Sequence, residues 1–326
     1  MACGAHGVVQ VTVPWAEPRS RFTLLLERFA IDVLRHCDVS GATRNLRISW
    51  DEAWGVMPRA VTRGRACKEA RVVRRIGVDE KAVAKGHTYL TLVCNLAEGT
   101  VEPIAEDRTQ ESLDGYDAGL TQPQLDGIEA VAMDRGEPSL QATRAWVRDA
   151  TKKIVFDRFH IRGHVGQAVD TVRKQEHRTL MASSDERLKG NVLVALQPGE
   201  CTGTPASRVR RTDVPGAQGR QAWPIKEALR RLWHYVYPAS SWKLWKRWYF
   251  WATHSRLEPI RKAAETIRRH IDNILTYDQH PVTNTRSEGL NSQIQNIKSM
   301  DCGFRYTEPF KTAIYVRCGG LDLYSC

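Results

Sequence analysis

The feature that most constrains the fold is a series of β-rich segments between residues 71 and 107. RVVRRIGVDEK, HTYLTLVCNL and TVEPIAED are rich in β-branched and aromatic residues, and the segments AKGH and AEGT between them contain glycine. Short apolar runs separated by glycine-containing turns are typical of strands that follow one another in a sheet. We therefore predict a three-stranded antiparallel meander.

Helical and strand patterns alternate after the meander. TQESLDGYDAGL and PSLQATRAWVRDA have helical patterns, whereas GIEAVAMD and KIVFD have strand patterns. A meander followed by alternating helices and strands predicts an α/β fold, a ribonuclease-H-like mixed sheet flanked by helices. After residue 159 the pattern becomes largely helical and basic. The segment from Leu196 to Pro224 is rich in Gly, Pro, Ser and Thr, which predicts a loop or a disordered stretch.

Two short helical patterns lie between Val39 and Val61. Ser49 and Glu52 have the S-x-x-E spacing of a capping box, which marks the start of the second helix. Two helices joined by a tight turn predict a helix-turn-helix, in which the second helix enters the major groove of DNA. Periodicity alone leaves open two packed amphipathic helices without that function.

Charge and cysteine content narrow the functional classes. The chain of 326 residues has a formal net charge of +11, which favours a polyanionic partner such as nucleic acid. No apolar run is long enough to span a bilayer, so we expect a cytoplasmic protein that is nucleoid-associated when bound to DNA. Eight scattered cysteines form no CxxC pair, which predicts reduced thiols rather than a disulfide framework or a complete zinc site.

Asp79 and Asp134 each come at the end of a predicted strand. If the two strands are neighbours in the sheet, both carboxylates could point into one cleft. Each aspartate taken alone is more often a turn or capping residue. Their positions at predicted strand ends therefore make both aspartates candidates for a functional site but do not decide their role.

A third carboxylate, Glu288, lies near the start of the helix predicted in PVTNTRSEGLNSQIQNIK (281–298). At 3.6 residues per turn this helix has an apolar stripe of Leu290, Ile294 and Ile297. Its other half carries Glu288, Ser292 and Gln295, with Asn291 and Lys298 at the margin. A first-turn glutamate is favoured by the helix dipole alone, but that explains only its charge.

Three carboxylates from different elements can bind two Mg²⁺ or Mn²⁺ ions, which prefer oxygen ligands. Two such ions can activate an attacking oxygen and stabilise the leaving oxygen of a phosphodiester. Asp157, His160 and His164 in FDRFHIRGH are weaker candidates for metal ligands, because such residues are more often helix caps or packed histidines.

The segment LWHYVYPASSWKLWKRWYFWATHSR mixes aromatic residues with bases. Four tryptophans recur every three residues in it, at positions 242, 245, 248 and 251. Such a helical face is more often part of a core, although the rings could instead stack on unpaired bases. We expect Lys243, Lys246 and Arg247 on the wet side, in contact with phosphates.

Long motifs along nearly the whole chain resemble the ISL-three (ISL3) family of bacterial insertion-sequence transposases, which belong to the DDE class. They include IGVDEKAVAKGHTYLTLV, KIVFDRFHIRGHVGQAVDTVRKQEHR and EGLNSQIQNIK. The resemblance implies a catalytic and metal-binding triad of Asp79, Asp134 and Glu288. It also implies a ribonuclease-H-like domain in which a largely helical insertion separates the second and third acidic residues.

The implied function is DNA transposition: two-metal-ion strand cleavage and strand transfer by a homo-oligomer bound to double-stranded DNA, without a membrane. The domains expected are residues 1–70 (remnant of a zinc module and helix-turn-helix), 71–159 (first part of the catalytic domain), 160–280 (helical insertion) and 281–326 (last part of the catalytic domain and tail). The residues expected to bind DNA are Arg47, Ser49, Trp50, Lys243, Lys246, Arg247, Asn291, Gln295 and Lys298.

Three departures from the family pattern leave other functions open. MACGAHG resembles only the end of the family's zinc module, DRGEPSL replaces an aromatic-containing run after Asp134, and residues 197–221 lack the usual helical, charged character. An N-terminally truncated copy could be a catalytically defective DNA-binding relic. A metal-dependent nuclease that does not join strands is the other alternative.

Overall fold

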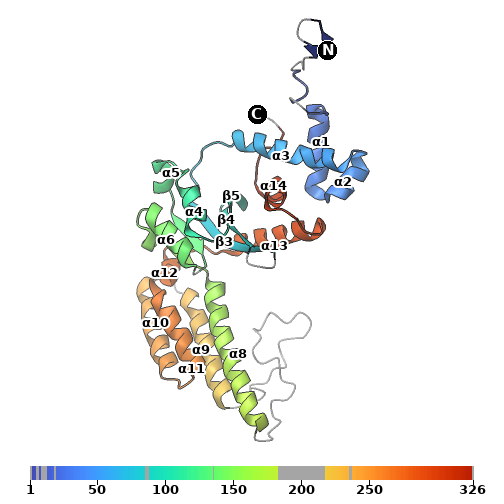
Figure 1. Ribbon diagram of the computed structural model, residues 1–326. Helices are drawn as coiled ribbons and strands as arrows, with labels where there is room; N and C mark the ends of the chain where they lie inside the picture. The colour runs from blue at the N-terminus through green and yellow to red at the C-terminus, as the bar shows by residue number, and fades with distance from the viewer. Residues whose placement is uncertain are drawn as a thin grey trace. The chain divides into compact units, whose positions relative to one another are not determined.

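The structure is a computed structural model that divides into two compact units (Figure 1). It describes residues 2–4, 7–8, 13–17, 20–84, 88–134, 136–182, 217–234 and 237–324. The first unit comprises Met1–Ile128, Gln141–Trp146 and Asn284–Cys326, and the second comprises Glu129–Leu140 and Val147–Thr283. Each unit therefore combines segments that lie far apart in the sequence. The four domain boundaries expected from the sequence stay a prediction.

The first unit contains three consecutive helices: α1 (Leu24–His36), α2 (Val39–Leu46) and α3 (Trp50–Ala66). They pack against one another, and α2 and α3 confirm the predicted helix-turn-helix. The capping box is present, because Ser49 Oγ accepts the Glu52 N–H and a Glu52 carboxylate oxygen accepts the Ser49 N–H at 2.9 Å. The turn contains no glycine, so Arg47 takes the left-handed conformation, with φ of 56°.

Helix α1 was not predicted, although its sequence contains the signals of a helix. Thr23 accepts the Leu26 N–H as an N-cap, and Ala30, Ile31 and Leu34 are buried at helical spacing. Glu27 is also buried, where it pairs with Arg59 of α3 at 2.5 Å. The acidic residue inside the apolar stripe disguised the pattern.

The predicted meander is confirmed as β3 (Arg75–Ala84), β4 (Thr88–Asn95) and β5 (Thr100–Glu106). β4 pairs antiparallel with both other strands, and its register places Gly77 opposite Cys94 and Asp79 opposite Leu92. Every residue of β4 from Leu90 to Asn95 is buried, so both faces of this strand are covered.

The five strands β3 to β7 are ordered β5-β4-β3-β6-β7 in one mixed sheet. β6 and β7 are parallel, whereas β3, β4 and β5 are antiparallel. This sheet, with its flanking helices, confirms the predicted α/β fold of the ribonuclease-H type. The elements after β5 are α4 (Gln110–Asp117), α5 (Gln122–Asp126), β6 (Ala130–Met133), α6 (Glu137–Trp146), α7 (Ala150–Lys153) and β7 (Ile154–Phe156).

Two C-terminal helices, α13 (Thr285–Met300) and α14 (Thr307–Cys318), complete the core of the first unit. Leu290, Ile294 and Ile297 are buried, as predicted, in one cluster with residues of α1, α3 and the meander. Tyr315 of α14 accepts the Ile104 N–H at 3.0 Å, and Arg317 donates to the Leu34 and Cys37 carbonyls. α14 thus joins the helix-turn-helix region to the sheet.

The helical insertion is confirmed in its described part. The helices α8, α9, α10 and α11 pack side by side in the second unit (Figure 1). The elements are α8 (Arg158–Ala182), α9 (Ala217–Arg230), η3 (Arg231–His234), α10 (Pro238–Thr253), α11 (Glu258–Arg269), α12 (Ile271–Leu275) and η4 (Thr276–Asp278).

The predicted loop at residues 196–224 is wrong at its C-terminal end, because α9 begins at Ala217 and contains Pro224. Glu176 of α8 accepts the N–H groups of Gln218 and Gly219 and so caps the new helix. Ala222 and Ile225 are fully buried. Tertiary contacts therefore override the local composition here, and residues 183–216 lie outside the described residues.

The N-terminal segment contains two short antiparallel strands, β1 (Ala2–Cys3) and β2 (Gly7–Val8). The proposed zinc-module remnant, residues 1–7, lies partly outside the described residues. The prediction of reduced thiols holds for four cysteines and is wrong for Cys67, which is disulfide-bonded; sequence spacing does not show which residues the fold brings together. The four free thiols are Cys37, Cys94, Cys302 and Cys318. In the part of the chain that the structure describes, no helix is long and apolar enough to cross a membrane.

Candidate active site and nucleic-acid interface

Helix α13 lies directly on strand β3, and Gly77 makes this close approach possible. A Cβ at Gly77 would clash with Ser287 Oγ and would lie 2.8 Å from Leu96 Cδ2 and 3.1 Å from Asn284 Oδ1. The two polar residues are buried at the N-terminal end of α13. Only glycine at position 77 therefore allows the start of α13 to pack this closely on β3.

The prediction that Asp79 ends a strand is wrong, because Asp79 lies in the middle of β3, where Asn291 of α13 holds its carboxylate. Asn291 Nδ2 donates to Asp79 Oδ2 at 2.6 Å, and the Glu80 N–H donates to Asp79 Oδ1 at 2.8 Å. Lys81, two residues farther along β3, donates to the Asn291 carbonyl at 3.5 Å. Both oxygens of Asp79 thus accept hydrogen bonds that fix the orientation of the carboxylate.

A third contact shows that α13 and β3 run in the same direction. Lys298, near the end of α13, donates to the carbonyl of Val83, near the end of β3. At about 3.3 Å per residue, Gly77 and Val83 are about 20 Å apart along the strand. At 1.5 Å per residue, Ser287 and Lys298 are about 17 Å apart along the helix. These similar lengths allow helix and strand to stay in register from one end to the other.

The candidate carboxylate Glu288 lies on the same helix as Asn291, the residue that holds Asp79. Glu288 precedes Asn291 by three residues, and residues at i and i+3 share one face of a helix. The Glu288 side chain is half-buried, and its N–H donates to the Asn284 carbonyl at 2.9 Å. The two candidate carboxylates therefore lie on two elements, β3 and α13, that pack against each other.

Arg286 fastens the start of α13 to the turn that joins β4 and β5. Its guanidinium donates to the Leu96 carbonyl at 2.7 Å and also to the Ala97 carbonyl. Hydrogen bonds from a charged donor are stronger than neutral ones. The N-terminal turn, which carries Glu288, is thus fixed on two sides.

The electrostatics of this region follow from burial and close charges. Burial lowers the pKa of Lys81, Lys298 lowers it further, and the nearby Asp79 raises it. Burial raises the pKa of the Cys94 thiol, which lies opposite Gly77, to about 12. Burial therefore favours the neutral thiol form of Cys94.

Asp134 follows β6 in the second unit and is exposed. Its Oδ2 lies 3.7 Å from His160 Nδ1 in the first turn of α8. Asp157 is buried and accepts the Phe159 N–H at 2.5 Å. It therefore caps the start of α8, which was the alternative to a role as a metal ligand. This arrangement makes His160 a neighbour of one candidate carboxylate, a relation that helical spacing alone did not indicate.

The donor chemistry of the three candidates suits Mg²⁺ or Mn²⁺, because these ions prefer carboxylate oxygens. Among the described residues no three His, Cys, Asp or Glu side chains are grouped as a metal site. That result includes Asp157, His160 and His164, whose interpretation as metal ligands it does not support. Since Asp79 and Glu288 lie in the first unit and Asp134 in the second, the triad stays a prediction.

The helix-turn-helix presents Arg47, Ser49 and Trp50 at the start of α3, where all three are exposed. Trp50 stacks on Trp54 with ring centroids 5.4 Å apart, and Trp54 contacts Phe304. Ser49 is occupied by the capping box, but the Trp50 ring faces solvent on one side. The exposed positions are compatible with the predicted DNA contacts.

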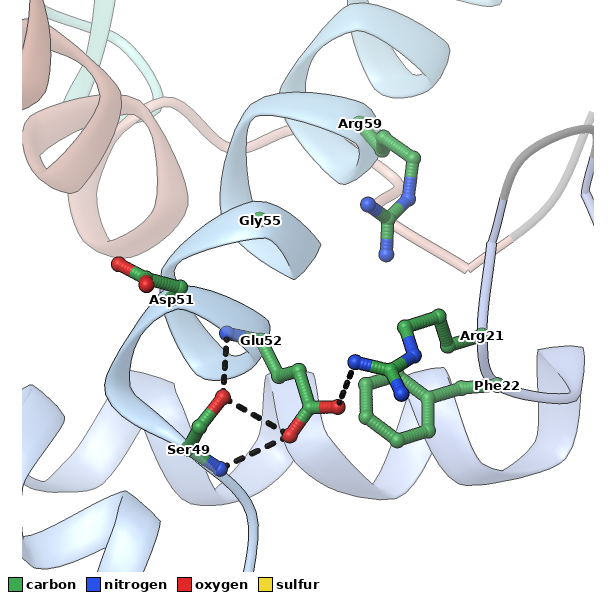
Figure 2. Close-up of a pocket in the computed structure, with 7 residues that line it drawn as sticks. All are labelled: Arg21, Phe22, Ser49, Asp51, Glu52, Gly55 and Arg59. Atoms are coloured by element: carbon green, nitrogen blue, oxygen red, sulfur yellow. Dashed lines mark hydrogen bonds and ion pairs between the residues drawn. The ribbon is translucent and has the colours of Figure 1, made fainter.

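A pocket also lies at the start of α3 (Figure 2). Glu52 pairs with Arg21 at 3.0 Å in this pocket, and its hydrogen bonds with Ser49 lower the pKa of its carboxyl. The pocket is lined by Arg21, Phe22, Ser49, Asp51, Glu52, Gly55 and Arg59. It contains none of the candidate carboxylates, and Arg59 in its lining pairs with Glu27, outside the pocket. We assign it to the stability of the helix start.

Helix α10 divides the aromatic segment between core and surface. Trp245 and Trp248 are buried, and Trp248 Nε1 donates to the Ile225 carbonyl at 2.7 Å. Trp242 and Trp251 are 37% and 40% exposed, so the prediction that all four tryptophans form one core face is half wrong. A spacing of three moves 60° around the helix at each step, so the four rings cannot share one narrow stripe. Lys243, Lys246 and Arg247 are exposed, as predicted.

Two predicted DNA contacts on α13 have other partners in the structure. Asn291 holds Asp79, and Lys298 contacts the Val83 carbonyl, whereas Gln295 is exposed. The positioning contact of Asn291 was missed because it joins residues 212 positions apart. The sequence did contain one indication of this contact: Asn291 lies between the apolar stripe and the polar face of the helix, and a residue there can reach a neighbouring element.

The chain is similar to known transposases over most of its length. The ISL3 family of the DDE class, described as "Transposase", matches residues 76–314, and the helix-turn-helix domain of transposase family ISL3 matches residues 11–61. The transposase for insertion sequence element IS1001 of Bordetella parapertussis is 24% identical over 306 residues, which cover 91% of this chain and 73% of that protein. The transposase for element IS1557 of Mycobacterium tuberculosis (strain CDC 1551 / Oshkosh) is 23% identical over 335 residues, covering 93% and 73%.

Proposed function

The chain belongs to the ISL3 family of insertion-sequence transposases, and we propose that it cuts DNA strands at transposon ends and transfers them to target DNA. Membership includes a DNA-binding helix-turn-helix and a DDE domain, and such transposases normally use divalent metal ions. The finer proposal is that Asp79, Asp134 and Glu288 hold two Mg²⁺ or Mn²⁺ ions. It rests on family motifs at these positions and on the fixed pairing of β3 with α13.

The single observation that supports this proposal most strongly is the hydrogen bond from Asn291 to Asp79. It ties the helix that carries Glu288 to the strand that carries Asp79. Both residues lie in motifs that match the family. Bound divalent ions would supply activation of the attacking oxygen and stabilisation of the leaving oxygen. The contribution of the protein is to fix its carboxylates before substrate arrives, because each loss of orientation costs rate.

The reaction consists of two phosphoryl transfers. In the first, water forms a new P–O bond, and the 3′ oxygen of the element leaves and takes up a proton. In the second, this 3′-hydroxyl attacks a phosphodiester of target DNA, loses its proton, and displaces another 3′ oxygen. Neither transfer needs a covalent protein intermediate, which accounts for carboxylates rather than a serine or cysteine at the predicted site.

The proposed DNA contacts fall into two groups. Arg47, Ser49 and Trp50 are exposed on the helix-turn-helix, and we propose that they bind the duplex ends. Lys243, Lys246 and Arg247 lie on α10 and supply charge for phosphates, with Gln295 as an exposed polar contact on α13. We also propose that the protein acts as a homo-oligomer, because two transposon ends are joined to one target.

A plasmid assay tests the catalytic proposal. Supercoiled plasmid carrying the element's ends is incubated with the purified full chain, with Mg²⁺ or with EDTA, and nicked and joined products are separated on a gel. We expect nicks at the ends and joined products only with Mg²⁺. Binding without nicking would contradict catalysis, and nicking without joined products would contradict strand transfer. Light scattering of the protein on end DNA tests the homo-oligomer.

A further inference from the structure

The exposed side of α10 combines three aromatic rings with three cations. Its members are Trp242, Lys243, Lys246, Arg247, Phe250 and Trp251, which we call the aromatic–cation face. At 100° per residue, Trp242 and Trp251 lie at the two margins of an exposed arc of about 180°, and Phe250 lies near its middle. The buried Trp245 and Trp248 lie on the opposite side.

The rings of this face remain open to solvent. Phe250 is 64% exposed, and Trp242 and Trp251 are more than one-third exposed. Phe250 stacks on His254 with ring centroids 3.9 Å apart, which holds the Phe250 ring in place while its outer surface stays accessible. A large exposed ring on a rigid helix loses little conformational freedom when a flat partner stacks on it.

The charges of the face have one sign. α10 contains no Asp or Glu, and its three cations are exposed. Within the part of the chain that the structure describes, no ion pair joins Lys243, Lys246 or Arg247 to a carboxylate. By contrast, Arg261 and Lys262 of α11 pair with Glu258, and Arg268 pairs with Glu265, at i+3 and i+4 spacing. The face on α10 is thus electrostatically complementary to a polyanion.

Aromatic platforms between cations are the features that bind single-stranded nucleic acid, because every base has a flat face to stack and every nucleotide has a phosphate. Base pairs in duplex DNA are already stacked on one another, so they offer no flat face to a side chain. A purely duplex-binding surface would need the cations but not the three rings. Core packing is already supplied by Trp245 and Trp248 and does not account for exposed rings.

We propose that the aromatic–cation face of α10 binds unpaired DNA, with bases stacked on Trp242, Phe250 and Trp251 and phosphates on Lys243, Lys246 and Arg247. This inference deepens the proposed function and rests on it for the source of unpaired strands, which strand cutting at a transposon end creates. The binding itself requires neither metal nor cleavage.

The first test is the affinity of the full chain for a fluorescently labelled oligo(dT) of 20 nucleotides, measured by polarisation in EDTA. We expect Trp242→Ala, Phe250→Ala and Trp251→Ala each to weaken binding about 5-fold to 100-fold. Trp251→Phe, which keeps a ring, should recover much of the affinity. Tyr306→Ala removes an exposed ring outside α10 and should leave it unchanged. Circular dichroism checks that every variant is folded.

The second test separates rings from charges through salt dependence. Replacing Lys243, Lys246 and Arg247 together by glutamine should lower the slope of log affinity against log salt by about 2, because each phosphate that is no longer neutralised lowers it by about 0.7. The ring variants should lower affinity while keeping the slope. Equal slopes in the cation variant and the unmodified chain would overturn the role of the three cations.

Three further outcomes would overturn the proposal. The ring variants could bind oligo(dT) as tightly as the unmodified chain, they could lose duplex affinity to the same extent, or they could change only self-association in light scattering. The last result would assign the face to a second copy of the chain. Failure of plasmid cleavage with intact oligo(dT) binding would contradict only the proposed catalysis, so the two proposals fail separately.

Discussion

Helices α13 and α10 contain similar types of residue but pack against different neighbours in the fold. Each has an apolar stripe, and each has polar or cationic side chains that we predicted to contact DNA. In α13 the side chains of Asn291 and Lys298 turn to β3 and bind Asp79 and the Val83 carbonyl. In α10 the cations stay in solvent between exposed rings. A polar residue beside an apolar stripe therefore serves either the fold or a partner, depending on the neighbouring element.

The comparison predicts that substitutions in the two helices change different measured quantities. Substitution of the candidate carboxylates should have the largest effect. Asp79→Asn or Glu288→Gln should lower Mg²⁺-dependent cleavage by about 10³-fold or more, because loss of a metal ligand removes several kcal/mol of transition-state stabilisation. The measurement is the rate of plasmid nicking at the transposon ends. Duplex binding in EDTA should stay within about twofold, and unchanged nicking would remove both residues from the proposed site.

Asn291 should come next, as a positioning residue that acts through Asp79. We expect Asn291→Ala to lower cleavage about 10-fold to 100-fold and to raise the Mg²⁺ concentration needed for half-maximal rate. Asn296→Ala, at an exposed position of the same helix, is the matched control and should change neither quantity. A lower rate with an unchanged Mg²⁺ requirement would indicate a structural role instead.

Gly77 tests how closely α13 must approach β3. Gly77→Ala should lower the free energy of unfolding by about 1–3 kcal/mol, because the new Cβ meets Ser287 and Leu96. A Cβ at Gly289 of α13 has no atom within 4 Å, so Gly289→Ala should leave stability unchanged or raise it by up to about 1 kcal/mol. Urea denaturation measures both values. Equal stability of the two variants would contradict the close packing of helix and strand.

The smallest effects come from one lysine on each helix, and they test the comparison directly. Lys246→Gln should lower the slope of log oligo(dT) affinity against log salt by about 0.7, with no change in stability. Lys298→Gln should lower the free energy of unfolding by about 1 kcal/mol, since it loses its bond to Val83, and should keep the slope. The comparison breaks down if Lys298→Gln changes the salt slope and Lys246→Gln does not.

Much of the fold followed from local patterns. The meander, the later strands and the capping box at Ser49 were predicted, since β-rich runs, glycine turns and an S-x-x-E spacing are properties of neighbouring residues. Helix α1 was missed because buried Glu27 interrupts its apolar pattern, and only Arg59, 32 residues away, explains the burial. The start of α9 was missed because its cap, Glu176, comes from another helix.

The candidate site shows the same division. Periodicity alone indicated that Glu288 lies off the apolar stripe of its helix, and resemblance supplied Asp79 and Asp134 as its partners. Neither could show that Asn291 orients Asp79, or that His160 lies beside Asp134. Those contacts are set by the packing of strands and helices that are distant in the chain.

The sequence by itself determined the family, the α/β class and the apolar stripe of α13, because these depend on residue identity and on spacings of a few residues. Only the tertiary structure decided which polar side chains of α13 and α10 face a strand and which face solvent. The physical reason is that a buried amide or ammonium group must find a hydrogen-bond partner, and the partner comes from whichever element packs alongside. In α13 that element is β3, whereas the outer arc of α10 is open to solvent.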